Sequence, residues 1–275
     1  MLKKQEISDR NWDYLIVLDA CRFDFFKKIY DKFFNRKVEP RKSRGSTTPE
    51  WAKKTFKEHY DLTYFSANPF ISNSDIPFKR LGAVKNYDWS AQNHFSEVID
   101  VWRSGWNEEI GTIPPKELNL AFLKNKPEKA IIHYIQPHEP YITLEKDFKL
   151  KLALINEKKD NKSLKKLIGN HILKKLSREK QGFIRKNYWG LRKLSGKAPK
   201  NAFEFFWRNG NAEKYYLENL KIVLRSVKNL IDELEGTIII TSDHGELLGE
   251  YNIWGHYHGS EKKELIKVPW LKMKK

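Results

Sequence analysis

Thr237-Ile238-Ile239-Ile240-Thr241 runs directly into Ser242-Asp243-His244-Gly245-Glu246. A short run of apolar and β-branched residues without charge is typical of a strand that is buried on both faces of a parallel sheet. The residues that follow carry a carboxylate, an imidazole and a second carboxylate. A buried strand that ends in ionisable side chains predicts a fold with a parallel sheet and a functional site at the carboxyl end of this strand.

Similar strands are predicted elsewhere, and helical patterns alternate with them. The strands are expected at Tyr14–Leu18, Leu62–Ser66 and Ala130–Ile135, with a last one at Ile266–Leu271. Helices are expected at Asp24–Phe34, from Thr48 onward, at Pro115–Lys124 and at Asn211–Glu235. This alternation predicts an α/β fold with a mostly parallel sheet and helices on both faces. The aromatic segment 70–106 gives no clear pattern.

Polar side chains follow four of these strands. Asp19 comes directly after the first, Asn68 after the second, His138 after the third, and Asp243 with His244 after the fourth. Ligands of open α/β sheets bind at the carboxyl ends of the strands. Carboxylates and imidazoles that meet at one edge would supply oxygen and nitrogen ligands for a divalent cation. The sequence therefore predicts a metal-centred site there.

The length and composition of the chain limit the classes of protein to which it can belong. The chain has 275 residues, and 52 Lys and Arg against 35 Asp and Glu give a net charge of 52 − 35 = +17. The length suits a single catalytic domain over residues 1–275. A single Cys excludes an internal disulfide framework and a cysteine-based zinc site. Neither a membrane-spanning run nor a signal peptide is visible, so we expect a cytoplasmic protein, free or peripheral to the membrane.

Most of the positive charge lies in one segment. Residues Lys146–Lys200 hold 18 Lys or Arg and four Asp or Glu, a net of 18 − 4 = +14. Apolar residues at helical spacing between the lysines predict a basic, mostly helical insertion at about residues 145–210. Two readings remain open. The insertion is either a solvated surface or a patch that attracts a polyanionic glycan or an anionic membrane, and nucleic acid is the less favoured partner.

Two segments resemble the alkaline phosphatase superfamily, in particular its sulfatase-like branch and its small archaeal members. Leu15–Asp24 is similar to the first strand of that family and its D-x-x-R-x-D motif. Thr241–Glu250, followed by Gly255-His256 and Leu265–Pro269, is similar to the S-D-H-G-E-x-L-G-E ending. The segment Pro137–Tyr141 is similar to a P-H-x-P-Y element of the same branch. The resemblance implies the α/β fold of that family, with the basic segment as an insertion.

The resemblance also implies roles for individual residues. It implies metal binding by Asp19, Asp243, His244, His256 and the nucleophile, with one or two ions of Mn, Zn, Ca or Mg. His138 and His256 would contact the leaving group or a second ion, and Asn68 would hold a non-bridging oxygen of the ester. Arg22 either binds the substrate anion or forms a structural ion pair with Asp24. His133 is expected to pack within the sheet.

The nucleophile is expected within Ser46-Thr47-Thr48, before Pro49. Sulfatases carry a Cys in this segment, and this chain has none there. Thr48 is favoured because it is expected to cap the helix directly before Pro49, whereas alignment on Pro selects Thr47; Ser46 is the third candidate. A hydroxyl that a metal activates at a helix N-terminus is suited to attack an anionic ester.

Two functions of different classes follow. The first is a metal-dependent hydrolase or transferase of phosphate or sulfate esters with a Thr nucleophile, acting on an anionic ester substrate such as a glycan or a lipid-linked molecule. The alternative is a catalytically inactive copy of the fold that binds a polyanion or a membrane surface. The near-complete set of expected ligands favours the enzyme, because a binding module has no physical need for it.

Overall fold

The computed structural model describes residues 2–9, 11–74, 87–144 and 176–275, and it divides into two compact units. The first unit contains residues 1–142, 216–246 and 256–275, and the second contains residues 143–215 and 247–255. Within the described ranges, no helix is long and apolar enough to cross a membrane. Residues 146–175, which include the expected apolar helical pattern of the insertion and several of its lysines, lie outside the described ranges.

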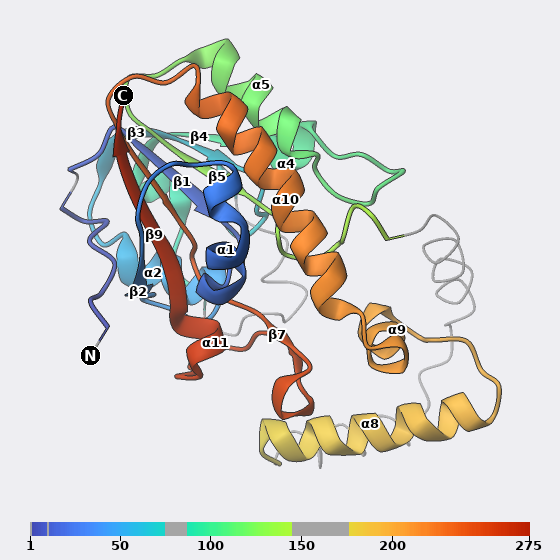
Figure 1. Cartoon of the computed structure of the whole chain (residues 1–275). Coiled ribbons are helices and arrows are strands. Elements are labelled where there is room, and N and C mark those ends of the chain that lie inside the picture. Colours follow the sequence, from blue (N-terminus) through green and yellow to red (C-terminus); the bar gives the residue numbers. More distant parts are fainter. Residues whose placement is uncertain (1, 10, 75–86, 145–175) are drawn as a thin grey trace. The chain divides into compact units, whose positions relative to one another are not determined.

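The first unit is built on a seven-stranded sheet with the order β2-β9-β6-β1-β5-β3-β4 (Figure 1). Strands β6, β1, β5, β3 and β4 pair in parallel, and β9 pairs antiparallel with both β6 and β2. The strands are β1 (Tyr14–Leu18), β2 (Val38–Lys42), β3 (Tyr60–Ser66), β4 (Phe95–Asp100), β5 (Ala130–Tyr134), β6 (Thr237–Thr241) and β9 (Lys267–Lys274). The predicted mostly parallel α/β sheet is confirmed.

Two strands were not expected. Strand β4 lies in the aromatic segment that gave no pattern. Only Phe95 and Val98 of its six residues are buried, and its charged residues hide the alternation. Strand β2 contains Pro40 and Arg41 and lies at the edge of the sheet, where it pairs with β9. An edge strand tolerates Pro, which cannot donate a ladder hydrogen bond, so its sequence reads unlike a buried strand.

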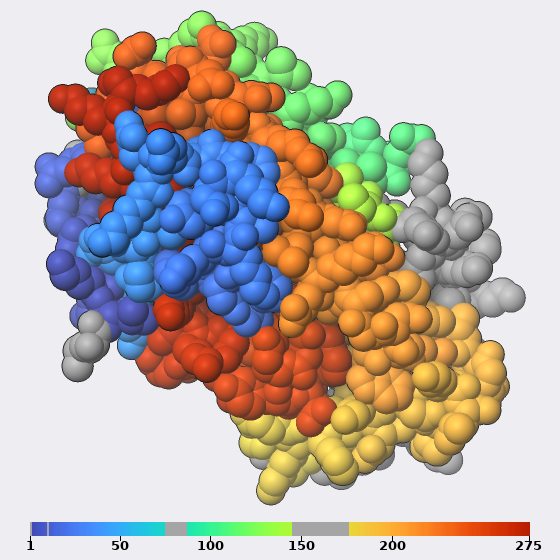
Figure 2. Space-filling view, viewed as in Figure 1, coloured from blue at the N-terminus to red at the C-terminus, as the bar shows by residue number. Residues whose placement is uncertain are grey.

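Helices cover both faces of this sheet, as predicted. On one face, α1 (Phe23–Ile29) lies beside α10 (Ala212–Ile231) (Figures 1 and 2). The rings of Phe25 and Tyr216 meet there edge to face at 5.0 Å. On the same face, Phe122 of α5 (Pro115–Asn125) packs against Phe65 of β3 at 5.5 Å. The remaining short helical elements of this unit are η1 (Tyr30–Lys32), η2 (Ala91–Asn93), α4 (Val101–Ser104) and α11 (Lys263–Ile266).

The opposite face is covered by α2 (Thr48–Thr55), whose Trp51 is fully buried. Trp51 and Phe56 pack in an aromatic cluster against Tyr64 and Phe95 of the sheet. Large aromatic side chains bury much surface, so this cluster fixes α2 firmly on the sheet. It also fixes the segment that precedes α2, where the nucleophile is expected.

The second unit contains α8 (Arg178–Leu194), α9 (Ala202–Asn209), the hairpin of β7 (Leu247–Leu248) and β8 (Trp254–Gly255), and the turn η3 (Glu250–Asn252). Glu204 of α9 is buried and accepts hydrogen bonds from Arg192 at 3.2 Å and from Arg208. A buried carboxylate needs such partners. The described part of the predicted insertion, from residue 176 to residue 210, is thus largely helical.

Gly45 supplies a test of how α2 is held. A Cβ atom at Gly45 would collide with the backbone nitrogen of Trp51, because the chain passes very close to the first turn of the helix. We expect Gly45→Ala to lower the free energy of unfolding by about 1–3 kcal/mol through this overlap. The matched change Gly190→Ala meets only ordinary contacts and lies in a helix, so it should be neutral or slightly stabilising. Thermal unfolding of both variants checks this, and equal melting temperatures would contradict it.

Candidate active site

The first part of the site is the end of β1 and the end of β6. Asp19 follows β1, and the turn after it is held by Ala20 in a left-handed conformation (φ 58°). The Ala20 N–H donates to Asp243 Oδ1 at 3.1 Å, and the Ala20 carbonyl accepts from the Tyr216 hydroxyl at 2.6 Å. A non-glycine residue rarely adopts positive φ, so these bonds hold the turn that presents Asp19.

His244 has its ring orientation set by the backbone. Its Nδ1 lies 2.8 Å from the carbonyl of Gly245, which can only accept, so Nδ1 carries the proton. Its Nε2 therefore presents a lone pair, 3.4 Å from Asp19 Oδ1 and 3.4 Å from Asp243 Oδ2. Burial lowers the pKa of His244 well below its usual value, with a further contribution from His256. A neutral imidazole held in this way is the form that binds a metal.

Thr48 is the hydroxyl that reaches this group. Its Oγ1 donates to Asp243 Oδ2 at 2.7 Å and lies 3.4 Å from His244 Nε2. Asn68, after β3, donates from Nδ2 both to Thr48 Oγ1 at 3.0 Å and to Asp19 Oδ2 at 2.7 Å. The structure thus gathers the expected Asp19, Thr48, Asn68, Asp243 and His244 at one edge of the sheet.

The two other hydroxyls of the segment Ser46-Thr47-Thr48 form their hydrogen bonds with different groups. Thr47, rather than Thr48, is the N-cap of α2: its backbone is extended and its Oγ1 accepts from the Glu50 N–H at 3.4 Å. The expectation that Thr48 caps the helix is therefore wrong, because Thr48 is already the first helical residue. Ser46 donates from Oγ to Glu50 at 2.8 Å and lies against the Tyr257 carbonyl.

Glu50 anchors the start of α2. It accepts from the N–H of Ser46 at 2.9 Å, from the N–H of Gly259 at 3.1 Å and from Lys54 at 2.5 Å. Burial alone would raise the pKa of Glu50, but these hydrogen bonds outweigh it and lower the pKa to about 2. The charged carboxylate therefore ties the segment before Thr48 to the loop after β8.

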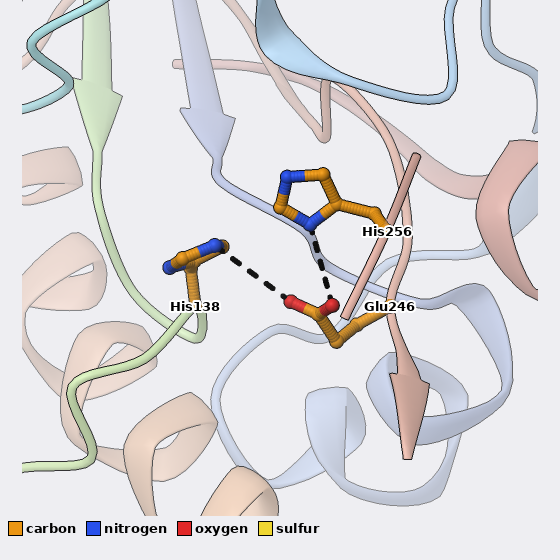
Figure 3. A group of neighbouring side chains, drawn as sticks. All are labelled: His138, Glu246 and His256. Atoms are coloured by element: carbon orange, nitrogen blue, oxygen red, sulfur yellow. Dashed lines mark hydrogen bonds and ion pairs between the residues drawn. The ribbon is translucent and has the colours of Figure 1, made fainter. Parts of the chain in front are cut away.

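A second group lies beside the first. Glu246 Oε1 is 3.3 Å from His256 Nδ1, and Glu246 Oε2 is 3.9 Å from His138 Nε2 (Figure 3). Burial would lower the pKa of His256, but the neighbouring Glu246 raises it above its usual value. Burial lowers the pKa of His138, so one imidazole of the pair favours the charged form and the other the neutral form. The rings of His244 and His256 are 4.3 Å apart, which joins the two groups.

The donors of both groups fit a divalent cation. Asp19, His133 and Asp243 have ligand atoms within 4.8 Å of one another, and so have His138, Glu246 and His256. Asp19 Oδ1 and His133 Nε2 are buried without a hydrogen-bond partner. Burial first, and then the charges of Asp243 and Glu246, raise the pKa of Asp19 well above its usual value. Buried carboxylates with unpaired atoms are stabilised by a bound cation, so the residues fit the metal that the sequence predicted.

Two members of the site were not expected from the sequence. His133 of β5 was expected only to pack within the sheet, and it is buried there. Its Nε2 also lies 3.8 Å from Asp243 Oδ2, which was not expected, and its Nδ1 pairs with the Tyr64 hydroxyl at 2.8 Å. Glu246 was visible in the S-D-H-G-E motif but was not assigned a role. Its spacing of three residues from Asp243 across a Gly was the available signal.

Arg22 forms the ion pair with Asp24 that was one of its two expected roles. Its guanidinium pairs with Asp24 at 2.7 Å and donates to the backbone carbonyl of Glu246 at 3.2 Å. The pairing with Arg22 outweighs the effect of burial and lowers the pKa of Asp24. Arg22 therefore braces the loop that carries Glu246.

A cavity of about 260 Å³ opens beside Thr48. Asp19, Thr48, Asn68, His138 and His256 line it, and so does Glu139, whose pKa is raised to about 7 by burial and by the charge of Glu246. The other walls are mostly apolar: Pro49, Ala67, Pro69, Phe70, Trp106, Thr112, Ile113, Ile135 and Pro140. A small ester group with an apolar neighbour has room here.

Comparisons of the whole structure find the same fold in a phosphoethanolamine transferase. The chain matches the integral membrane protein lipooligosaccharide phosphoethanolamine transferase A of Neisseria meningitidis with a TM-score of 0.53 and 14% identity, over 100% of this chain and 48% of that one. It thus spans about half the length of that transferase. A zinc complex of the periplasmic domain of EptC from Escherichia coli gives a TM-score of 0.48 and 11% identity, over 95% and 72% of the two chains.

A phosphonate monoester hydrolase of Silicibacter pomeroyi matches with a TM-score of 0.47 and 14% identity, over 94% and 67% of the chains, and sulfatases also match. No protein-family model and no curated protein sequence matches the chain. The match to the phosphoethanolamine transferase shows that this chain shares its fold, and this agrees with the α/β fold that the sequence motifs predicted.

The two carboxylates nearest Thr48 should control metal binding. We expect Asp19→Asn and Asp243→Asn each to weaken the binding of Mn or Zn by about a hundredfold, because each removes a charged oxygen from the group. Metal content after dialysis, measured by mass spectrometry, checks this. Asp61→Asn is the matched control, since Asp61 lies at the opposite end of β3 and should leave metal content unchanged. Wild-type metal content in both site variants would contradict the assignment.

The pKa of Glu50 predicts a pH dependence of stability. A carboxyl whose pKa falls from 4.5 to about 2 on folding contributes stability that is fully present above pH 4.5 and is lost as the pH falls from 4.5 toward 2. Glu50→Gln should therefore be less stable than wild type at neutral pH, and the difference should shrink below pH 4.5. Urea unfolding at a series of pH values measures it. A difference that is the same at every pH, or that the exposed control Glu233→Gln reproduces, would contradict the role of Glu50.

Proposed function

We propose that this chain is a metal-dependent hydrolase or transferase of phosphate esters, with Thr48 as the nucleophile. The single observation that supports it most is the position of Thr48 Oγ1, between Asp243 Oδ2 at 2.7 Å and Asn68 Nδ2 at 3.0 Å and beside His244. A hydroxyl held by a carboxylate acceptor, an amide donor and metal-binding groups is arranged for attack on an ester.

The metal would be held by Asp19, Asp243 and His244, with His133 within reach, and it supplies positive charge that lowers the pKa of a bound hydroxyl. Thr48 passes its proton to Asp243 as its oxygen attacks the phosphorus. Asn68 donates a hydrogen bond to an oxygen of the ester, where negative charge develops. The N-terminus of α2, directly at Thr48, favours the same charge.

The leaving group departs as an alcohol. The bond from phosphorus to the ester oxygen breaks, and that oxygen takes a proton from a neighbouring acid. His256 suits this role, since Glu246 raises its pKa, and both His256 and His138 line the cavity. Water or an acceptor alcohol then attacks the phosphorus of phosphorylated Thr48, and the former acid takes up the proton of that nucleophile. The bond from phosphorus to Thr48 Oγ1 breaks, and Oγ1 takes back the proton that Asp243 received.

The substrate class follows from the cavity. Phe70, Trp106 and Ile113 form apolar walls next to polar and ionisable groups, which suits an anionic ester with an apolar or ring-shaped neighbour. We propose phosphate rather than sulfate because the chain has no Cys in the nucleophile segment, whereas sulfatases use a modified Cys there. A glycan or a lipid-linked phosphate ester falls within this class.

Separate substitutions of Thr47 and Thr48 test which of the two is the nucleophile. We expect Thr48→Ala to lower the turnover of p-nitrophenyl phosphate or its diester at least about a thousandfold, and Thr48→Ser to retain measurable activity. Thr47→Ala should cost about 1 kcal/mol of stability through the lost cap and leave turnover close to wild type. Intact mass of a trapped reaction should show a phosphate on wild type that Thr48→Ala lacks.

The assay is run with Mn, Zn, Ca and Mg in turn, and with p-nitrophenyl sulfate as the competing substrate. Faster reaction with the sulfate would overturn the preference for phosphate, and loss of activity in Thr47→Ala alone would overturn the choice of Thr48. No reaction with any ester and no metal retained would favour the binding module over the enzyme.

A further inference from the structure

Helix α8 (Arg178–Leu194) exposes apolar side chains that a solvated helix would keep inside. Leu194 is 87% exposed, Leu191 68% and Phe183 58%, and Ile184 and Tyr188 are exposed as well. Ile184, Tyr188 and Leu191 follow the i, i+4, i+7 spacing of one helix face, and Phe183 and Leu194 lie at its margin. Several large apolar residues on one face mark a surface that binds something apolar.

The opposite face of α8 is already used. Gly182 and Trp189 are its buried residues, and Trp189 meets Trp254 at 5.3 Å and Trp207 at 6.0 Å. A Cβ at Gly182 would collide with the backbone carbonyl of Asn252, so only glycine lets the helix approach this closely. These contacts fix the rotation of α8 and turn the apolar face outward, where part of the helix is visible in yellow in Figure 2.

Cations accompany this apolar face. The helix contains Arg178, Lys180, Arg185, Lys186, Arg192 and Lys193 against the single acid Glu179. Arg192 is held by Glu204, but Lys180, Arg185, Lys186 and Lys193 form no ion pair with any residue in the described ranges. Long basic side chains can lay their apolar stems along a helix and extend their charges to the headgroup level.

We propose that α8 lies flat in the surface of an anionic membrane, with Phe183, Ile184, Tyr188, Leu191 and Leu194 inserted among the lipids. Apolar residues backed by unpaired cations are the chemistry of an interfacial helix, which rests on a bilayer without spanning it. At 1.5 Å per residue, this 17-residue helix is about 25 Å long, enough to lie along the headgroups.

Other occupants explain fewer of these features. A soluble polyanion would be bound by the cations alone and gives no reason for Leu191 and Leu194 to face outward. A second copy of the chain would bring the same positive charge to the interface, which opposes association. An anionic lipid surface matches both the charge and the apolar face, and the proposal does not depend on the reaction at Thr48.

The test is sedimentation of the full chain with vesicles. We expect binding to vesicles of equal parts phosphatidylglycerol and phosphatidylcholine, weak or no binding to pure phosphatidylcholine, and a decrease as salt rises. The variant with Phe183→Gln, Leu191→Gln and Leu194→Gln should bind about a hundredfold more weakly, because three side chains lose their transfer into lipid. Leu120→Gln, an exposed leucine of α5, is the matched control and should bind like wild type.

A dye at Leu194→Cys reports insertion directly. The only native cysteine, Cys21, is buried, so an environment-sensitive maleimide should label the new thiol, and its emission should shift to the blue on anionic vesicles. Circular dichroism confirms that each variant is folded.

Three outcomes would overturn the proposal. In the first, the apolar variant still binds vesicles, the variant with Lys186→Gln and Lys193→Gln does not, and the dye emission does not shift. This result would mean that α8 is attracted electrostatically to any polyanion. Self-association in sedimentation velocity that the apolar variant abolishes, without vesicle binding, would mean a second copy of the chain. The absence of both vesicle binding and self-association would mean that the face is only a solvated surface.

Discussion

Buried negative charge at the carboxyl edge of the sheet is the constraint on which the site depends. Asp19 and Asp243 are almost completely buried, and no Lys or Arg of the described ranges forms an ion pair with either. Carboxylates without a cation are costly in the interior of a protein. The neighbouring groups respond to that charge: Asn68 and Thr48 donate to the two carboxylates, and His244 presents a lone pair rather than a proton. A divalent cation held by these residues would balance their negative charge.

The position of Thr48 depends on contacts made outside this group. Gly45 allows the chain to pass against the backbone of Trp51, and Trp51 anchors α2 in an aromatic cluster on the sheet. Glu50 then ties the first turn to the N–H groups of Ser46 and Gly259. Preorganised groups on rigid elements are what a site needs in order to act on its substrate without rearrangement. The contacts that stabilise the start of α2 are therefore the same contacts that set the position of Thr48.

The two units of the chain carry different chemistry. The carboxylates, imidazoles and Thr48 all lie in the unit that contains the sheet, whereas the exposed apolar and basic face belongs to α8 in the other unit. Glu204 neutralises part of the positive charge within the second unit by holding Arg192 and Arg208. Lys180, Arg185, Lys186 and Lys193 of α8 form no ion pair within the described ranges.

The sequence by itself determined the parallel sheet and the edge at which the polar residues meet. Buried parallel strands read as continuous apolar runs, and their carboxyl ends share one edge, so Asp19, Asn68, Asp243 and His244 could be placed together without knowledge of the fold. Local patterns were weaker for β2 and β4, whose charged or proline-containing sequences resemble loops.

Only the tertiary structure decided which of three adjacent hydroxyls faces the metal-binding groups. The rotation of a helix start is set by contacts with residues distant in the chain, here Asp243 and Gly259, and no local pattern encodes it. Only the tertiary structure shows that His133 lies near Asp243, because the sequence of a strand that is buried on both faces does not indicate which of its residues point toward the site. The tertiary structure likewise decides the role of Arg22, whose partners Asp24 and the Glu246 carbonyl meet only when β1 and β6 pair with each other.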